Sequence, residues 1–197
     1  MYDWAQSQNR VVDVLINNAG IGVFGYFHRN EMDKELNMLN LNVLNVFRMT
    51  KLFLQDMVPR DDGTIINIAS NSAFTHVPKF SVYASTKAFV SHFSQCLQEE
   101  MVMQEKSVRI MVVCPAAISD TPFKKAAEME YVKTFEGLAA TTAEEVADDV
   151  WKAFKAKKTF IVSGRKMRFI YAIRNWIPAR LQRRLVQDEV SERWDRE

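Results

Sequence analysis

The sequence has few cysteines, no long apolar run and almost no net charge. Its two cysteines, Cys96 and Cys114, exclude a disulfide framework, and nothing near them resembles a zinc site, so no metal is expected. No stretch of about 18 apolar residues is present, which excludes a transmembrane helix, and the first ten residues lack a signal-peptide core. The formal net charge of +2 gives no general attraction to nucleic acid. We therefore expect a cytoplasmic protein with a single domain over residues 1–197.

Apolar runs and helical patterns alternate along the chain. The runs at residues 11–16, 64–69, 108–114 and 159–164 are continuously apolar, which is typical of strands buried on both faces of a parallel sheet. Helical patterns occupy residues 31–58, where Pro59 is expected to end the helix, 82–104 and 142–155. Thr142 and Glu145 have the spacing of a capping box. This alternation predicts an α/β fold with a doubly wound parallel sheet.

Three strands end in polar or small residues, in the sequences "NNAG", "NIAS" and "CPAA". Ligands of doubly wound sheets bind beyond the carboxyl ends of the strands. These tails are therefore expected to lie together at one edge of the sheet and to form the functional site.

The sequence "SVYASTKAFV" places Tyr83 four residues before Lys87, so both lie on one face of a helix. A lysine ammonium near a phenol stabilises the phenolate and lowers its pKa, which suits proton exchange with a carbonyl or an alcohol. The alternative is an ordinary pair on a helix surface, because this spacing arises easily by chance.

Other residues of the predicted edge have weaker signals. Ser70 ends the second strand thirteen residues before Tyr83, and its hydroxyl could bind a substrate oxygen or simply begin a turn. Gly20 allows close approach of the backbone, although "NNAG" also suits a plain turn. Asn42 lies in the apolar sequence "LNVLN" within a helix, where asparagine is unfavourable, so a specific role is expected.

The order and spacing of these residues resemble the short-chain dehydrogenase/reductase family. The resemblance implies a Rossmann-like fold and a catalytic tetrad of Asn42, Ser70, Tyr83 and Lys87. In the family the tyrosine is the general acid or base, and the serine positions the substrate carbonyl. The lysine lowers the tyrosine pKa and binds the nicotinamide ribose, and the asparagine holds a water of the proton relay.

The resemblance also implies NAD or NADP as cofactor. Tyr83 and Lys87 are expected to contact it together with two segments, which comprise Asn18, Ala19 and Gly20 after the first strand and Pro115, Ala116 and Ile118 after the third. The second segment departs from the family, because Ala116 stands where glycine is usual and Thr121 lies one residue later than usual.

The expected activity is interconversion of a carbonyl and a secondary alcohol by an NAD(P)-dependent oxidoreductase. Residues 119–137 are expected to cover the substrate and suggest that the substrate is apolar, through Phe123, Met129, Tyr131 and Phe135. These side chains could instead pack beneath the segment. The partners are thus a small carbonyl or alcohol substrate and, in the full-length form, further copies of the chain.

The family's glycine-rich phosphate loop is not found before "NNAG", where sixteen residues precede the motif and none is glycine. We therefore expect a fold that lacks its first strands and this loop. A chain of this kind should bind NAD(H) or NADP(H) poorly and expose the edge of its first strand. The alternative function is a truncated, non-catalytic remnant.

Residues 165–197 form an amphipathic and basic C-terminal segment. Between Arg165 and Arg184 it has seven basic residues, no acidic one and several large apolar ones. Weak attachment to anionic membrane surfaces is one interpretation. The favoured alternative is a helix that covers the substrate pocket or contacts another subunit.

Overall fold

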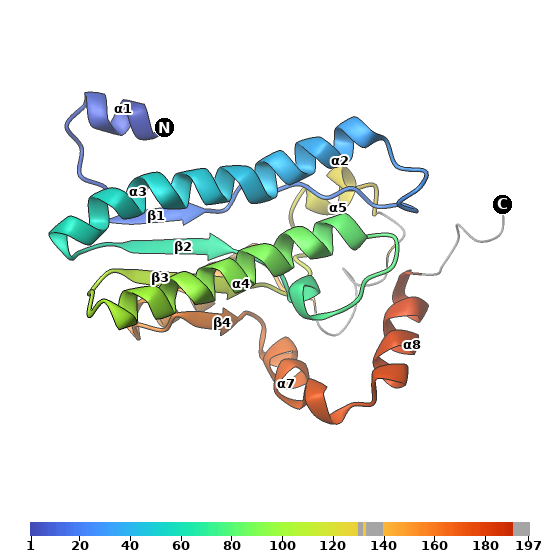
Figure 1. Cartoon of the computed structure of the whole chain (residues 1–197). Helices are drawn as coiled ribbons and strands as arrows, with labels where there is room; N and C mark the ends of the chain where they lie inside the picture. Colours follow the sequence, from blue (N-terminus) through green and yellow to red (C-terminus); the bar gives the residue numbers. More distant parts are fainter. Residues whose placement is uncertain (130–131, 133–139, 191–197) are drawn as a thin grey trace.

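Four parallel strands form the sheet in the computed structural model, which describes residues 1–129, 132 and 140–190 (Figure 1). They lie side by side in chain order, as β1 (Val14–Asn17), β2 (Thr64–Ile68), β3 (Arg109–Cys114) and β4 (Phe160–Val162). The register places Asn17 beside Asn67 and Cys114 beside Val162, so all carboxyl ends reach one edge. The predicted strands are confirmed, with small shifts at their ends.

The helices and helical turns connect these strands and extend beyond β4. They are α1 (Tyr2–Ser7), α2 (Met32–Leu39), η1 (Asn40–Asn45), α3 (Val46–Arg60), η2 (Asn71–Phe74), α4 (Ser81–Met103), α5 (Phe123–Ala126), α6 (Ala143–Lys155), α7 (Arg165–Ile173), η4 (Arg174–Trp176) and α8 (Ala179–Val190).

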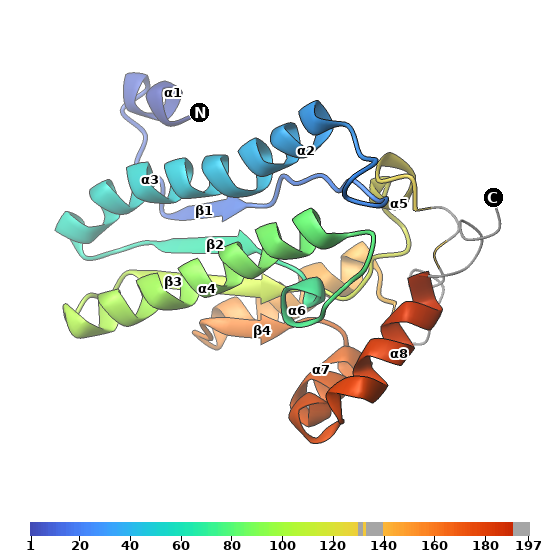
Figure 2. The same cartoon turned by 45° about the vertical axis from the view of Figure 1, so that its right-hand side comes forward.

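Helices cover both faces of the sheet, as a doubly wound fold requires. On one face α3 and α4 pack against Leu15, Ile65 and Ile110. On the other face α6 packs against Ile66 and Met111. Figures 1 and 2 show α3 and α4 on the near side of the sheet. Alternate residues of each strand therefore face different helices, which explains the continuously apolar runs.

The crossover connections between the parallel strands differ in their handedness. The two crossovers from β1 to β2 and from β2 to β3 run over the near face and are right-handed (Figure 1). The crossover from β3 to β4 continues in the same direction across the sheet, but its helix α6 lies on the opposite face. It is therefore left-handed, an arrangement that parallel strands rarely adopt.

The long helix expected over residues 31–58 differs from the prediction in two ways. A π-helix, η1, separates α2 from α3 and holds the buried Asn42. Pro59 does not end the helix, which continues to Arg60 and ends at Asp61 in the left-handed conformation. Proline is tolerated there because only the last turn loses a backbone hydrogen bond.

The first strand β1 lies at an edge of the sheet. Val14 and Ile16 point away from α3 and are 40% and 55% exposed. The expected open edge at this strand is therefore confirmed. In the part of the chain that the structure describes, we find no helix long and apolar enough to cross a membrane.

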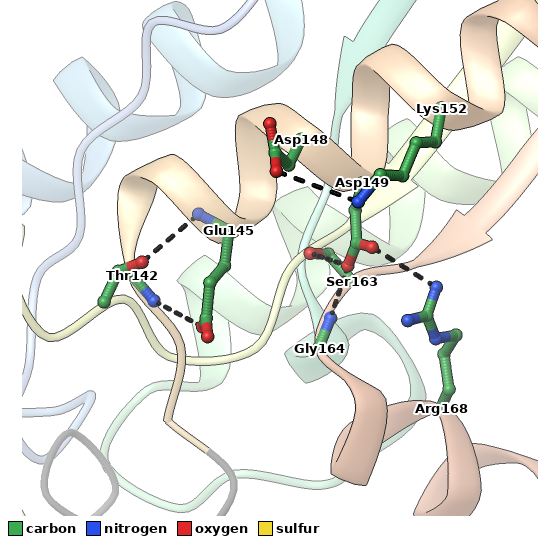
Figure 3. A network of polar contacts seen from close by, with 8 residues as sticks. All are labelled: Thr142, Glu145, Asp148, Asp149, Lys152, Ser163, Gly164 and Arg168. Atoms are coloured by element: carbon green, nitrogen blue, oxygen red, sulfur yellow. Dashed lines mark hydrogen bonds and ion pairs between the residues drawn. The ribbon is translucent and has the colours of Figure 1, made fainter.

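A polar network fixes α6 and α7 at the carboxyl edge (Figure 3). The predicted capping box of Thr142 and Glu145 begins α6. One turn later the Asp149 carboxylate accepts hydrogen bonds from the Ser163 hydroxyl at 2.9 Å and the Gly164 amide at 3.0 Å. An ion pair between Asp149 and Arg168 connects the first turn of α7 to this network. This network orients α7 relative to the sheet.

Candidate active site

The tails of the strands and the first turns of α4 line a cavity of about 480 Å³ at the carboxyl edge. Ser70 follows β2, Pro115 follows β3, and Tyr83 and Lys87 come from α4. The expected convergence of the strand tails is therefore found.

Tyr83 is buried among aromatic rings at this edge. Its ring stacks on Phe80, with centroids 4.1 Å apart, and tilts against Phe123 at 5.4 Å. Burial raises the pKa of Tyr83 to about 12, although a hydrogen bond with the Ser70 side chain acts in the opposite direction. The phenol is therefore protonated at neutral pH, and its hydroxyl interacts with that of Ser70.

Lys87 is buried one turn further along α4. Its Nζ donates a hydrogen bond to the carbonyl of Ile68 at 2.9 Å and lies 5.7 Å from the centre of the Tyr83 ring. Burial lowers the pKa of Lys87 to about 8. Burial, and not Lys87, dominates the pKa of Tyr83 in this structure, so the expected lowering of that pKa by Lys87 stays a prediction.

Asn42 and Gly20 bring the first strand's tail against α4. The Asn42 side chain accepts a hydrogen bond from the Ile21 amide at 3.0 Å and donates to the Ile21 carbonyl at 2.9 Å. It also donates to Thr86 at 3.2 Å. A Cβ at Gly20 would lie 3.2 Å from the Asn42 oxygen and 3.3 Å from Lys87 Nζ. Glycine is therefore needed here for close approach to both side chains.

Ser70 caps the short helix η2. Its Oγ accepts a hydrogen bond from the Ser72 amide at 3.2 Å and donates to Asn71 at 3.2 Å. Ser70 therefore begins a turn, as the alternative interpretation expected. It also lines the cavity together with Tyr83.

The residues expected at the cofactor are mostly on the cavity wall. The wall includes Asn18, Gly20, Tyr83, Lys87, Pro115, Ala116 and Ile118. Ala19 is exposed and is not part of it. Ala116 has an ordinary negative φ angle, so alanine replaces the family's usual glycine without backbone strain. Asn42 does not line the cavity, but its side chain is hydrogen-bonded to the backbone of Ile21, which follows Gly20.

The other half of the cavity comes from the C-terminal segment. Residues of α7, η4 and α8 line it, including Tyr171, Arg174 and Val186. The favoured interpretation of this segment, as a cover of the pocket, is therefore confirmed. Of the residues predicted to cover the substrate, Phe123 and Met129 line the cavity, whereas Tyr131 and Phe135 lie outside the described residues.

Two functional candidates are absent from the sequence-based prediction. Phe80 stacks on Tyr83, and its place three residues earlier at the helix start is a signal that could have found it. The Ser72 hydroxyl is buried at the cavity wall and has no hydrogen-bond partner in the described part of the chain. No sequence pattern distinguishes Ser72 from its neighbours.

Comparison with known proteins explains this arrangement. A family model described as short chain dehydrogenase matches residues 1–131. The chain belongs to this family. A ketoacyl reductase of Nostoc is 34% identical over 151 residues, which cover 77% of this chain and 51% of that protein. The human very-long-chain 3-oxoacyl-CoA reductase is 40% identical over 108 residues, which cover 53% and 34%.

A solved structure shares the fold and was obtained with a cofactor. A short-chain dehydrogenase from Sphingobium yanoikuyae in complex with NADPH superposes with a TM-score of 0.69 at 25% identity, covering 76% of this chain and 56% of that one. The Rossmann-like fold of this dehydrogenase family is therefore established for the chain, which spans about half or less of its two relatives' lengths.

Proposed function

We propose that the protein is an NAD(P)-dependent oxidoreductase that interconverts a carbonyl and a secondary alcohol. The observation that carries this proposal is the convergence of Tyr83, Ser70 and Lys87 on one cavity, where Lys87 Nζ lies 5.7 Å from the centre of the Tyr83 ring. Two hydroxyls on one cavity can bind one carbonyl oxygen and share the charge that develops on it.

Tyr83 is the proton donor or acceptor in this proposal. Its phenol remains protonated at neutral pH, so its hydroxyl can donate to a carbonyl oxygen as negative charge develops there. Ser70 donates a second hydrogen bond and keeps that oxygen next to the phenol. In the oxidation direction the proton returns from the alcohol to the Tyr83 oxygen, with Ser70 holding the alcohol in place.

Lys87 and Asn42 support this proton transfer. With its pKa near 8, Lys87 is mostly charged at pH 7 and becomes neutral just above, so it stabilises the phenolate that forms transiently beside it. Asn42 holds the backbone of Ile21 from both sides and so fixes the tail that carries Gly20 against α4.

The residues of the cavity fit the nicotinamide end of a dinucleotide. Gly20 leaves the backbone free of a side chain beside Lys87, and Pro115, Ala116 and Ile118 line the same cavity with apolar side chains. These residues would hold the nicotinamide and its ribose, as NAD or NADP. When bound, the nicotinamide supplies or accepts the hydride.

The names of similar proteins favour this function over a non-catalytic remnant. The relatives are named as a ketoacyl reductase and a 3-oxoacyl-CoA reductase, and the similar solved structure is named as a dehydrogenase with NADPH. An apolar ketone or acyl substrate also suits a cavity lined mainly by aliphatic and aromatic side chains.

Substitution of Tyr83 by phenylalanine tests this proposal. The variant loses the transferable proton but keeps the ring and its stacking on Phe80, so we expect turnover to fall at least about a thousandfold. Turnover of a ketone panel with NADH and NADPH would be measured in the chain and in a fusion that adds a relative's N-terminal part.

Tyr2→Phe is the matched control, since the Tyr2 hydroxyl bonds to exposed Asp56 and Tyr2 does not line the cavity. Near-normal turnover in Tyr83→Phe would refute the assignment of Tyr83. Absence of turnover in every unmodified form would favour the non-catalytic alternative.

We also propose weak contact of the C-terminal segment with anionic membrane surfaces. Its inner side lines the cavity, while its outer side exposes large apolar residues between basic ones, namely Phe169, Trp176 and Leu181 among Arg165, Lys166, Arg180, Arg183 and Arg184. Such a surface combines apolar insertion with attraction to anionic lipid.

A further inference from the structure

The charged side chains that line the described part of the cavity are all positive. Among the described residues that line it, Lys87 and Arg174 are the charged ones, and none is aspartate or glutamate. A mainly apolar cavity with two cations and no acid favours a ligand with negative charge.

The two cations lie in different parts of the fold. Lys87 is held at the strand edge by the carbonyl of Ile68, next to Tyr83. Arg174 comes from η4, which follows β4 at the opposite edge of the sheet from β1. The residues proposed to hold the nicotinamide follow β1 and β3, whereas Arg174 follows β4.

The Arg174 guanidinium is fixed in place by aromatic and backbone contacts. It lies 3.6 Å from the centre of the Tyr171 ring and 5.6 Å from that of Phe74. It donates to the Tyr171 carbonyl at 2.8 Å, and Gln182 of α8 donates to the Arg174 carbonyl at 2.7 Å. A guanidinium has five N–H donors, so several remain available after this one bond.

No carboxylate in the described ranges pairs with Arg174. A half-buried guanidinium without a counter-charge loses hydration and gains no ion pair in return. An anion in the cavity would provide that partner through the two-pronged geometry that arginine offers to carboxylate and phosphate groups.

We propose that the substrate is an amphipathic carbonyl compound whose anionic group, a carboxylate or a phosphate, pairs with Arg174. Its apolar body occupies the space between Arg174 and Tyr83, which is bounded by Phe74, Tyr171 and Phe123. Arg174 is then a specificity residue that binds the far end of the substrate and takes no part in proton transfer. This inference rests on the proposed function, which identifies the Tyr83 end as the reacting end.

A binding assay without turnover tests this inference. The uncharged probe N-phenyl-1-naphthylamine would be bound to the 197-residue chain and displaced by decanoate, decyl phosphate or the uncharged decanamide. We expect the anions to compete better than decanamide. In Arg174→Gln the affinity for the anions should fall about tenfold, because a charge-assisted bond is lost, while decanamide and the probe are unaffected.

Arg165→Gln is the matched control, because it removes one positive charge from the same segment at an exposed position off the cavity wall. Arg174→Lys should retain part of the preference for anions, since it keeps the charge but not the planar fork. Whichever of decanoate and decyl phosphate binds more tightly identifies the anionic group that the site prefers.

The inference is overturned if decanoate and decyl phosphate keep their advantage in Arg174→Gln, which would assign the anion to Lys87. It is also overturned if the anions have no advantage in the unmodified chain, or if the probe does not bind at all. None of these outcomes depends on hydride transfer, so the Tyr83→Phe experiment can fail or succeed independently.

Discussion

At the scale of single residues, burial acts on Tyr83 and Lys87 in opposite directions. It raises the pKa of the phenol to about 12 and lowers that of the ammonium to about 8, so both groups favour their neutral forms. The Tyr83 hydroxyl is thereby kept as a proton donor, and Lys87 can change charge within about one pH unit of neutrality.

The lowered pKa of Lys87 predicts a pH dependence of stability. Between pH 8 and 10.5 the unfolded chain binds this proton more tightly than the folded chain, so the free energy of unfolding rises with pH in that window. From pH 7 to 9.5 the gain is about 2 kcal/mol relative to a Lys87→Met variant. Urea denaturation of both proteins at the two pH values measures it.

Lys51→Met is the control, because Lys51 is exposed. Parallel pH profiles of the unmodified protein and Lys87→Met would contradict the lowered pKa. Above pH 10 the raised pKa of Tyr83 has the opposite sign and reduces stability in both proteins, so measurements should end below it.

The sequence allowed Ser70, Tyr83 and Lys87 to be placed at the candidate site, because their spacing is local or lies at a strand end. Tyr83 and Lys87 share a helix, and Ser70 ends a buried strand. The direction of the Tyr83 pKa shift was not predictable, since it depends on burial beneath Phe123, forty residues further along the chain. Arg174 was counted only as one of the seven basic residues of the C-terminal segment, because its place on the cavity depends on how that segment packs.

At the scale of elements, the strands and the helices α3, α4 and α6 follow directly from the sequence, whereas α1 and α5 were not expected. Continuously apolar runs gave all four strands, and the capping box gave the start of α6. The π-helix η1 and the left-handed crossover through α6 were not predictable, because both depend on contacts between distant segments. Likewise, the sequence pattern of α7 does not specify which side of the helix faces the cavity.

The network around Asp149 leads to a testable prediction about the position of α7. Burial raises the Asp149 pKa, but hydrogen bonds from Gly164 and Ser163 and the charge of Arg168 together lower it below its ordinary value. Asp149→Asn keeps the size but weakens all three contacts, so we expect a loss of about 1–2 kcal/mol of stability at neutral pH. The first turn of α7 should also exchange its amide hydrogens faster.

Hydrogen exchange and denaturation of Asp149→Asn would be compared with Asp148→Asn, whose carboxylate makes an exposed ion pair to Lys152. Because the Asp149 pKa is lowered, its contribution is present above pH 4 and is lost as the pH falls below that value. Equal effects of the two substitutions, or unchanged exchange in α7, would contradict the assigned role of Asp149.

At the scale of the whole molecule, the C-terminal segment has two different sides. One side closes the cavity, and the other exposes Phe169 and Trp176, which are 66% and 87% exposed. The amphipathic pattern was evident in the sequence, but which residues face inward was not. The expected homo-oligomer stays a prediction.

The membrane proposal predicts sedimentation of the chain with anionic vesicles at physiological salt and much less with neutral phosphatidylcholine vesicles. Replacement of Phe169 and Trp176 by serine should reduce the bound fraction severalfold, since the inserted apolar area is lost. Trp4→Ser, at an exposed position on α1, is the control. Equal sedimentation with both vesicle types, or no sedimentation at all, would exclude the proposal.

The π-helix η1 keeps the buried residues of α2, η1 and α3 on one side of the long helix. Buried residues recur there at intervals of four, at Met38, Asn42, Val46 and Thr50. In an uninterrupted α-helix each such step turns about 40° past a full rotation, so the stripe would wind around the helix. The wider turn of a π-helix cancels part of this drift. Asn42 therefore stays in line with the residues packed on α4, and deletion of one residue within η1 would rotate its amide away from Ile21.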